Sequence, residues 1–406
     1  MSIISVREAL DITLSNVNRL LPEEVLLLES RGRILAKDLV ADADLPPFTR
    51  STMDGYAVRS QDIQETPATL EVAGYVPAGA NPNFALKPHQ AAKIMTGAPL
   101  PRNADAVQQI EKTQSADDGM KVVILEAVNI GANVAVQGSD AHVGDTLATA
   151  GTYVSPAVVG LLASAGADVV AVYSRPSVAV LATGDELVDI TSKPLSGQIR
   201  NSNSYALHTQ VAQVGAYASL LGIARDHKAY IKNRVAQGLR HDMLLVTGGA
   251  SVGDLDLVGE VFEELGFQIL FSKVSIKPGK PLILAKAENT LIFGMPGNPV
   301  SSATVFEVFV RPAIRKMMGF PAYHNQIVSA LLTQHFFNRS KRENYHPAVT
   351  WYEEGRFYCR PLHSRGSGDV TTYALSNSYL ICTAEKTETH EGEPVEVMLR
   401  PDFYYQ

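Results

Sequence analysis

Acidic residues and glycines follow two runs in the middle of the chain that predict strands, and these residue types could bind a phosphate and a metal ion. The run 178–182 predicts a strand, and TGDE after it places Asp185 and Glu186 at the strand's end. The run 243–246 predicts another strand, followed by TGGASVGD at 247–254. Glycines let backbone N–H groups approach a phosphate closely, and a helix start favours an anion. A pair of carboxylates at such a place could hold a divalent cation.

Two further loops carry groups suited to the same chemistry. SKVSIKPGKP contains Lys273, Lys277 and Lys280, and MPGNPVS at 295–301 follows a strand and opens a helix. Each loop alone has a simpler explanation, because clustered lysines are usually solvated and glycine-rich turns are often only tight connections. Ligands of open α/β sheets bind beyond the carboxyl ends of the strands. Four such loops at one edge of one sheet therefore favour an anion pocket with carboxylates placed for a divalent cation.

The elements that must position these loops alternate between strand and helix from about residue 174 to 320. Short apolar runs typical of strands alternate with helical patterns, several of which end at a glycine. This alternation predicts a doubly wound α/β domain. The expected strands are 178–182, 218–223, 243–246, 282–285 and 290–293, and the expected helices are 204–214, 227–239, 255–265 and 300–318.

The rest of the chain predicts smaller, β-rich parts. Apolar spacing predicts a helix from Val6 to Leu20, ended at Pro22. We also expect a second short helix over 26–39, before an extended loop at 42–58. Residues 155–165 predict a further helix. We expect an extended linking domain of 1–48 with 139–173, a small β-rich domain at 49–138, the α/β domain at 174–324 and a C-terminal β domain at 325–406.

Composition excludes several functional classes. The 406 residues are 46 % hydrophobic and carry a formal charge of −7, which argues against a general nucleic-acid-binding face. No apolar run is long enough to span a membrane, and the first residues do not resemble a secretion signal, so we expect a cytoplasmic protein. The two cysteines provide neither a disulfide framework nor zinc spacing. A GxxxxGK[ST] phosphate loop is also absent from the sequence.

Seven strings, in this order, resemble the molybdopterin molybdenumtransferase family, which includes MoeA and the C-terminal domain of gephyrin. The strings extend over most of the chain, and their order is far more specific than any one of them. They are RGRILAKDL (31–39), STMDGYAV (51–58), IMTGAP (94–99), TGDEL (183–187), GGASVGD (248–254), IKPGKPL (276–282) and MPGNPVS (295–301).

The resemblance implies an elongated, multidomain α/β plus β fold around a molybdopterin-binding domain. It also implies a Mg²⁺-dependent transferase that takes adenylyl-molybdopterin and molybdate as substrates, releases AMP and leaves molybdenum on the pterin. Members of the family are homodimers with a cleft built from two subunits. A molybdopterin-adenylating protein and recipient molybdoenzymes are expected partners, and nucleic acid and membrane are not.

The resemblance further assigns roles to individual residues. Asp54 and Thr96 would reach across the dimer, Asp185 and Glu186 would hold magnesium, and Lys273 and Lys277 would bind molybdate or stabilise charge on the leaving phosphate. Asp226 and Asp256 would complete the acidic lining. The expected pterin- and phosphate-binding residues are Asp140, Gly248, Gly249, Ser251, Gly253, Lys280, Pro296, Asn298, Ser301 and Ser367.

One segment leaves an alternative open. NVAVQGSDA at 133–141 lacks the arginines that many members of the family carry here, although Asp140 is retained. The alternative to an active transferase is a molybdopterin-binding scaffold, or a paralogue with weak or altered catalysis such as a tungstate preference. Retention of Asp54, Asp185, Glu186 and both lysines favours the enzyme.

Overall fold

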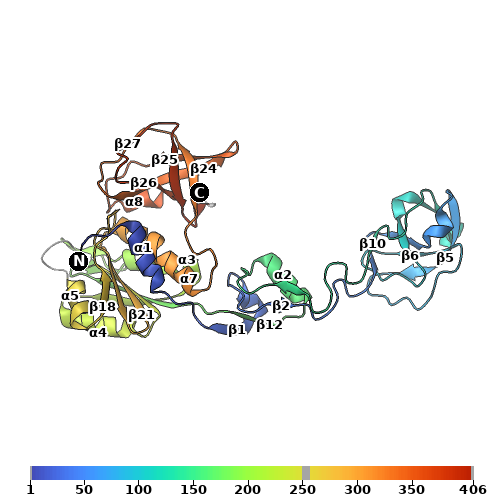
Figure 1. Ribbon diagram of the computed structural model, residues 1–406, viewed down its shortest axis with the longest axis horizontal. Helices are drawn as coiled ribbons and strands as arrows, with labels where there is room; N and C mark the ends of the chain where they lie inside the picture. Colours follow the sequence, from blue (N-terminus) through green and yellow to red (C-terminus); the bar gives the residue numbers. More distant parts are fainter. Residues whose placement is uncertain (1, 249–256, 404–406) are drawn as a thin grey trace. The chain divides into compact units, whose positions relative to one another are not determined.

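The computed structural model describes residues 2–248 and 257–403 (Figure 1). The chain forms two compact units, which we call the large unit and the small unit. The large unit comprises Met1–Val25, Gly32–Ala36 and Ala171–Gln406, and the small unit comprises Leu26–Arg31 and Lys37–Val170. The finer, four-part division of the chain stays a prediction.

A six-stranded mixed sheet is the centre of the large unit. Four neighbouring strands are parallel, and β20 and β18 complete the sheet through antiparallel pairs. The order is β16 (Tyr217–Ala224), β13 (Ser177–Thr183), β17 (Met243–Thr247), β21 (Thr290–Met295), β20 (Ile283–Ala287) and β18 (Gln268–Phe271). Buried, nearly continuous apolar strands of this kind are typical of sheets covered on both faces.

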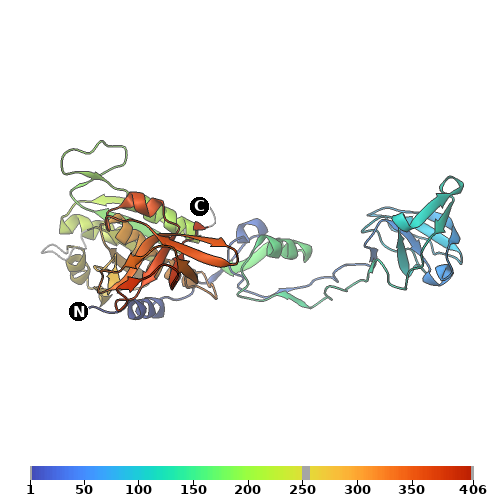
Figure 2. The same cartoon turned by 90° about the horizontal axis from the view of Figure 1, so that it is seen from above.

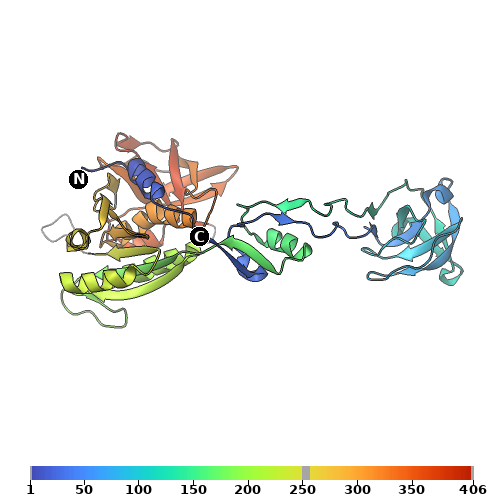
Figure 3. The ribbon, with the colours of Figure 1, turned by 60° about the horizontal axis from the view of Figure 1, so that its bottom comes forward.

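Alternate residues of β13 belong to two separate cores, which shows that both faces are covered. Val178 and Val180 pack in one core, and Ala179 and Leu181 pack in the other. The first core includes residues of α1 (Val6–Ser15), α3 (Asn203–Val214) and the continuous helix of α6 (Pro299–Val305), a π-helical turn (Phe306–Val310) and α7 (Arg311–Met317). The second includes residues of α4 (Lys228–Gly238) and α5 (Leu257–Glu264). Figure 3 shows α1 lying beside α7.

A second six-stranded sheet forms the C-terminal part of the large unit. Its order is β19 (Ile276–Lys277), β24 (Glu343–Glu353), β25 (Arg356–Pro361), β22 (Ile327–Leu332), β28 (Pro394–Leu399) and β26 (Ser378–Cys382). Because β24 also pairs with β26, five of these strands close into a ring around a core that includes Leu380 and Val397. The short helix α8 (Val370–Ala374) precedes β26. Since β19 lies in the lysine-containing loop, this loop links the two sheets.

The small unit contains a third six-stranded sheet with a core on each side. Its order is β7 (Ala106–Gln109), β4 (Gly55–Val58), β6 (Gln90–Ile94), β5 (Ala68–Val76), β9 (Lys121–Ile124) and β8 (Thr113–Ala116). The helix α2 (Pro156–Ser164) and two strand pairs, β3 (Arg50–Ser51) with β10 (Val134–Ala135) and β2 (Leu39–Val40) with β11 (Thr146–Ala148), complete this unit.

The expected central strands and helices are confirmed, and within the described residues their ends differ by at most two residues from those predicted. The helix predicted over 26–39 is wrong. The chain forms only a 3₁₀ turn at Leu27–Ser30, and Gly32 has φ +79°, which ends the turn. Leu26 and Leu28 are 62 % and 81 % exposed, so these two leucines do not pack into a core.

Two other predicted boundaries are corrected. The first helix ends at Ser15 instead of Leu20, because the side chains of Ser15 and Asn16 bond to the Ile12 carbonyl and compete with helical hydrogen bonds. The segment predicted as an extended loop at 42–58 ends in a real strand, β4. Within the described part of the chain, helices are too short or too polar to cross a membrane.

Candidate active site at the carboxyl edge of the central sheet

Four loops leave the same edge of the central sheet. Register pairs Thr183 with Ala224 and Thr247 with Met295, so the parallel strands β13, β16, β17 and β21 end side by side. Strand β18 is antiparallel to β20, which is antiparallel to β21, so β18 also ends at this edge. The sequence prediction that the acidic, glycine-rich, lysine-rich and MPGNPVS loops begin at one sheet edge is confirmed.

An acidic cluster occupies the ends of β13 and β16. The Asp226 backbone N–H donates to Asp185 Oδ1 at 3.2 Å, and Arg225 Nη1 donates to the Asp185 carbonyl at 2.7 Å. Loss of solvent raises the pKa of Asp226, and the negative charges of Asp185 and Glu186 raise it further. A divalent cation would relieve this repulsion, so the donor set fits a metal that prefers oxygen ligands.

Gly184 is required beside these carboxylates. Its φ is +153°, and a Cβ at this position would lie 2.6 Å from the Glu186 carboxylate. Because that carboxylate is the movable end of a side chain, the positive φ is what favours glycine at this position. The chain between β14 (Leu187–Val188) and β15 (Ile199–Arg200) then projects from the unit as a loop (Figure 2).

The glycine-rich loop begins with a tight backbone contact. Gly248 has φ +102°, and a Cβ there would lie 2.1 Å from the Thr183 carbonyl oxygen, so a glycine is required where β13 and β17 end together. The Cβ position of Gly297 lies 3.4 Å from Gly248 Cα, which brings the MPGNPVS loop to the same point. The other predicted residues of the glycine-rich loop lie outside the described residues, namely Gly249, Ser251, Gly253 and Asp256.

A polar network that the sequence analysis missed holds these two loops together. Asn203 Nδ2 donates to Thr247 Oγ1 at 3.1 Å and to the Gly297 carbonyl at 2.6 Å. Ser302 Oγ donates to the Pro296 carbonyl at 2.5 Å and lies 3.0 Å from Thr247 Oγ1. The signal in the sequence was NSNS at 201–204, a polar run at the start of a helix, which resembles an ordinary N-cap.

Two predicted substrate-binding residues from distant parts of the chain meet at the start of α6. Asn298 Nδ2 donates to Ser367 Oγ at 2.9 Å, and the Val300 N–H donates to the Ser367 carbonyl at 3.1 Å. The segment before α8 is thereby joined to the MPGNPVS loop. Ser301, in contrast, is buried in the first turn of α6.

The lysine-containing loop places its cations between the two sheets of the large unit. Lys277 lies on β19 opposite Asn344, and Arg342 Nη1 donates to the Ile276 carbonyl at 2.8 Å. Lys273 and Lys277 are exposed, and Lys280 is half-buried. Burial lowers the pKa of His346, and the charge of Lys277 lowers it further, which places this lysine near that ring.

The remaining predicted residues belong to the small unit. The N–H and the hydroxyl of Thr96 both donate to Asp54 Oδ1 at 2.7 Å, and these bonds lower the pKa of the Asp54 carboxyl. Asp140 lies in a turn in which its N–H donates to the Leu45 carbonyl at 2.8 Å. These hydrogen bonds join Asp54 of the STMDGYAV string to Thr96 of the IMTGAP string. Asp140 is bonded separately, to Leu45.

Known families match the chain in three consecutive segments. The MoeA N-terminal region (domains I and II) matches residues 4–166, the probable molybdopterin binding domain matches 179–316, and the MoeA C-terminal region (domain IV) matches 329–399.

Full-length relatives and solved structures agree with these matches. The molybdopterin molybdenumtransferase of Bacillus subtilis is 36 % identical over 93 % of this chain and 89 % of its own length, and that of a Nostoc species is 34 % identical over 98 % and 94 %. The structure of the molybdopterin biosynthesis MoeA protein from Pyrococcus horikoshii is similar with a TM-score of 0.81 and 32 % identity, covering 98 % of this chain and 99 % of that one. This chain therefore belongs to the molybdopterin molybdenumtransferase (MoeA) family.

Proposed function

We propose that this protein is a molybdopterin molybdenumtransferase that acts in molybdenum cofactor biosynthesis. The observation that carries the proposal is the carboxyl edge of the central sheet, where the acidic cluster and two close-packed glycine loops lie together. Relatives named for this activity are 36 % and 34 % identical over nearly the whole chain. The proposed reaction joins molybdate to adenylyl-molybdopterin and releases AMP.

Magnesium is the proposed metal, held by Asp185 and Glu186. Burial raises the pKa of Asp226 and the charges of Asp185 and Glu186 raise it further, and a cation among these three carboxylates would offset both effects. When bound, the ion would neutralise charge on the phosphoanhydride that is cleaved. Cleavage of this bond needs positioning and charge stabilisation more than a protein nucleophile.

The chain's other groups would bind and orient the substrates. Backbone N–H groups of the glycine-rich loop would bind the pterin phosphate, while Asn298, Ser367 and Pro296 shape the pterin side. Lys273 and Lys277 would stabilise negative charge on molybdate or on the departing AMP, and Lys280 would add to this positive field. The roles of Gly249, Ser251, Gly253 and Asp256 stay predictions.

A homodimeric, cytoplasmic enzyme completes the proposal. Asp54 and Thr96 would act on the site of the partner subunit, and Asp140 would be a further ligand-binding carboxylate. The two hydrogen bonds from Thr96 support this role, because they fix the orientation of the Asp54 carboxylate. The adenylating protein that makes the substrate and the molybdoenzymes that receive the product are the proposed partners.

The deciding experiment is AMP release from adenylyl-molybdopterin by the purified protein in the presence of magnesium, measured with molybdate, with tungstate and with neither. We expect release that depends on molybdate. Tight binding of the substrate without release would overturn the enzymatic proposal in favour of a scaffold, and release that depends on tungstate alone would identify a paralogue with altered metal use.

A further inference from the structure

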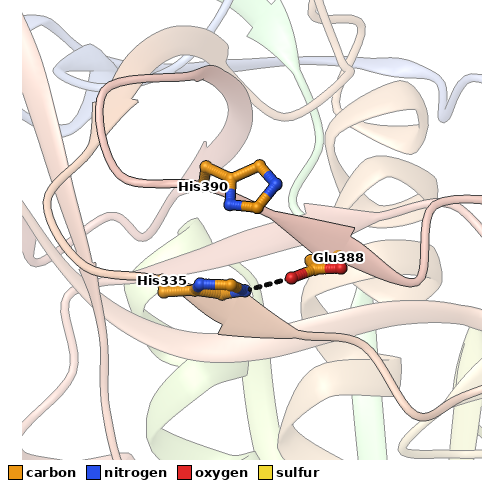
Figure 4. Close-up of side chains that lie close together, drawn as sticks. All are labelled: His335, Glu388 and His390. Carbon is orange, nitrogen blue, oxygen red and sulfur yellow. Dashed lines mark ion pairs between the residues drawn. The ribbon is translucent and has the colours of Figure 1, made fainter.

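Three metal-ligand side chains gather in the C-terminal part of the large unit, outside the proposed active site. His335, Glu388 and His390 each offer one ligand atom, and these atoms all lie within 4.8 Å of one another (Figure 4). All three side chains are exposed. The proposed transferase reaction uses none of them.

The backbone of two short strands explains why these residues meet. Strand β23 (Phe336–Phe337) pairs antiparallel with β27 (Glu388–Thr389), with Phe336 opposite Thr389. Continuing this register by one residue places His335 opposite His390. Because side chains alternate between faces, Glu388 and His390 share a face with His335. Residues directly opposite have Cβ atoms about 4.5–5.5 Å apart, so two imidazoles can reach one ion.

The side chains are already directed toward a shared point. His335 Nε2 lies 2.8 Å from Glu388 Oε1, and the two imidazole centroids are 4.8 Å apart with the rings inclined at 68°. The His335 ring also stacks on Phe337, with centroids 4.4 Å apart and an angle of 26°. This stacking restricts the rotation of His335, which reduces the conformational entropy that ligand binding would cost.

The turn after β27 is held by neighbouring charges. The His390 backbone N–H donates to Glu393 Oε1 at 3.1 Å, and Glu393 pairs with Lys386 at 2.8 Å. The pair neutralises the positive charge of Lys386, so this lysine opposes a cation at the cluster only weakly. The Glu393 carboxylate is held by Lys386 and by the His390 N–H. The donors of the cluster are therefore the two imidazole nitrogens and the Glu388 carboxylate.

We propose that His335, Glu388 and His390 form a binding site for a divalent transition metal ion of the zinc class. Imidazole nitrogens favour Zn²⁺, Ni²⁺ and Cu²⁺, whereas Mg²⁺ and Ca²⁺ prefer oxygen ligands. Zn–N distances of about 2.0–2.1 Å place tetrahedral ligands about 3.4 Å apart. The ligand atoms of these exposed side chains therefore need to approach one another by at most about 1.4 Å, which rotamer changes allow. Three protein ligands leave one position for water.

Zinc titration of the full-length protein, with any affinity tag removed, tests the site. Millimolar magnesium is present throughout, so that oxygen-ligand sites are occupied. We expect one saturable zinc site, weakened at least about tenfold by His390→Ala and by His335→Gln, since even loss of residues that only support metal ligands costs 10- to 100-fold. The matched control is His324→Ala, an exposed histidine outside the cluster, which should bind zinc like the wild type.

Copper provides a second readout that identifies the ligands. Electron paramagnetic resonance of one equivalent of bound Cu²⁺ should show coupling to two imidazole nitrogens, and to one in the His390→Ala variant. Asp185→Asn should leave both zinc and copper binding unchanged, which separates this site from the proposed magnesium site. Zinc binding that is absent, or equal in the wild type and the two histidine variants, would overturn the proposal whatever the outcome for AMP release.

Discussion

The backbone carbonyl of Asp185 has a structural role, and its side-chain carboxylate has the proposed chemical role. Its carbonyl accepts from Arg225, and Oδ1 accepts from the Asp226 N–H. Asp185→Asn preserves the backbone bond and an oxygen acceptor but removes a charge. We expect AMP release to fall by about 10²- to 10³-fold, as for other groups that stabilise transition-state charge, without a change in the unfolding temperature.

The control for this prediction is a nearby carboxylate with a local partner. Asp189 Oδ1 accepts from the N–H and the hydroxyl of Thr191, outside the acidic cluster. Asp189→Asn should therefore retain turnover. Wild-type activity in Asp185→Asn would contradict the role given to Asp185.

Two hydrogen bonds from Thr96 lower the pKa of the Asp54 carboxyl. The Thr96 N–H and hydroxyl both donate to the Asp54 carboxylate and hold that pKa below its ordinary value. Thr96→Val removes the hydroxyl bond, so the Asp54 pKa should rise. A depressed carboxyl pKa adds stability above the unfolded-state pKa that is lost as the pH falls through the folded-state pKa. In the variant this contribution should be smaller and should be lost at a higher pH.

Titration of the Asp54 carboxyl by NMR measures this shift. Thr113→Val is the matched control, because the Thr113 hydroxyl donates to the Ile110 carbonyl instead of to a carboxylate. The Asp54 pKa should be unchanged in the control. An unchanged pKa in Thr96→Val would mean that the N–H bond alone is responsible.

Gly248 combines a positive φ with a close contact. An alanine Cβ would lie 2.1 Å from the Thr183 carbonyl oxygen, and backbone atoms there cannot move aside without disturbing two sheet strands. Gly248→Ala should lower the free energy of unfolding of the large unit by roughly 2–4 kcal/mol. Gly368→Ala, which meets open space, should change it by less than about 0.5 kcal/mol in the same denaturant titration.

A buried ion pair joins the π-helical turn to the first residue of α7. Arg311 donates to both oxygens of Glu307, at 2.5 and 3.0 Å, and Gln210 donates to Glu307 at 2.6 Å. Glu307 and Arg311 are 4 % and 5 % exposed. Arg311→Leu would leave a buried carboxylate without its cation, so we expect a loss of about 3–5 kcal/mol in the free energy of unfolding.

An exposed pair provides the comparison for this element. Lys386 pairs with Glu393 at 2.8 Å, with both side chains partly in solvent. Lys386→Ala should cost less than about 1 kcal/mol, since water and salt screen such pairs. If both variants lose the same stability in urea titrations, burial does not govern the Glu307–Arg311 pair.

At the scale of the whole molecule, the proposed dimer has a testable consequence. Asp54 belongs to the small unit and Asp185 to the large unit. If each cleft uses one of these residues from each subunit, mixing Asp54→Ala with Asp185→Asn protein should restore about a quarter of wild-type AMP release. Half of the dimers would be mixed, and each would regain one of two clefts.

Mixing two variants of the same unit is the control for subunit exchange. Asp185→Asn combined with Glu186→Gln should restore nothing, because both residues would serve the same cleft. Recovery in neither mixture, after subunit exchange has been verified, would contradict a site built from two chains.

The sequence alone determined the central α/β sheet and the edge at which its loops gather. Alternating β-rich and helical patterns ended by residues such as Gly215 are local signals, because hydrophobic periodicity and a left-handed C-cap are encoded within a few residues. The family strings likewise pointed to Asp185 and Asn298, and the family resemblance to Ser367, before the bond between Asn298 and Ser367 was known.

Only the tertiary structure decided which of these groups meet. The hydrogen bond between Asn298 and Ser367 joins residues 69 positions apart. The hydrogen bond from Asn203 to the Gly297 carbonyl joins residues 94 positions apart. The cluster of His335, Glu388 and His390 depends on the register of two short strands. The failed helix at 26–39 has the same cause: periodicity predicts a face, but only packing decides whether a partner exists to bury it.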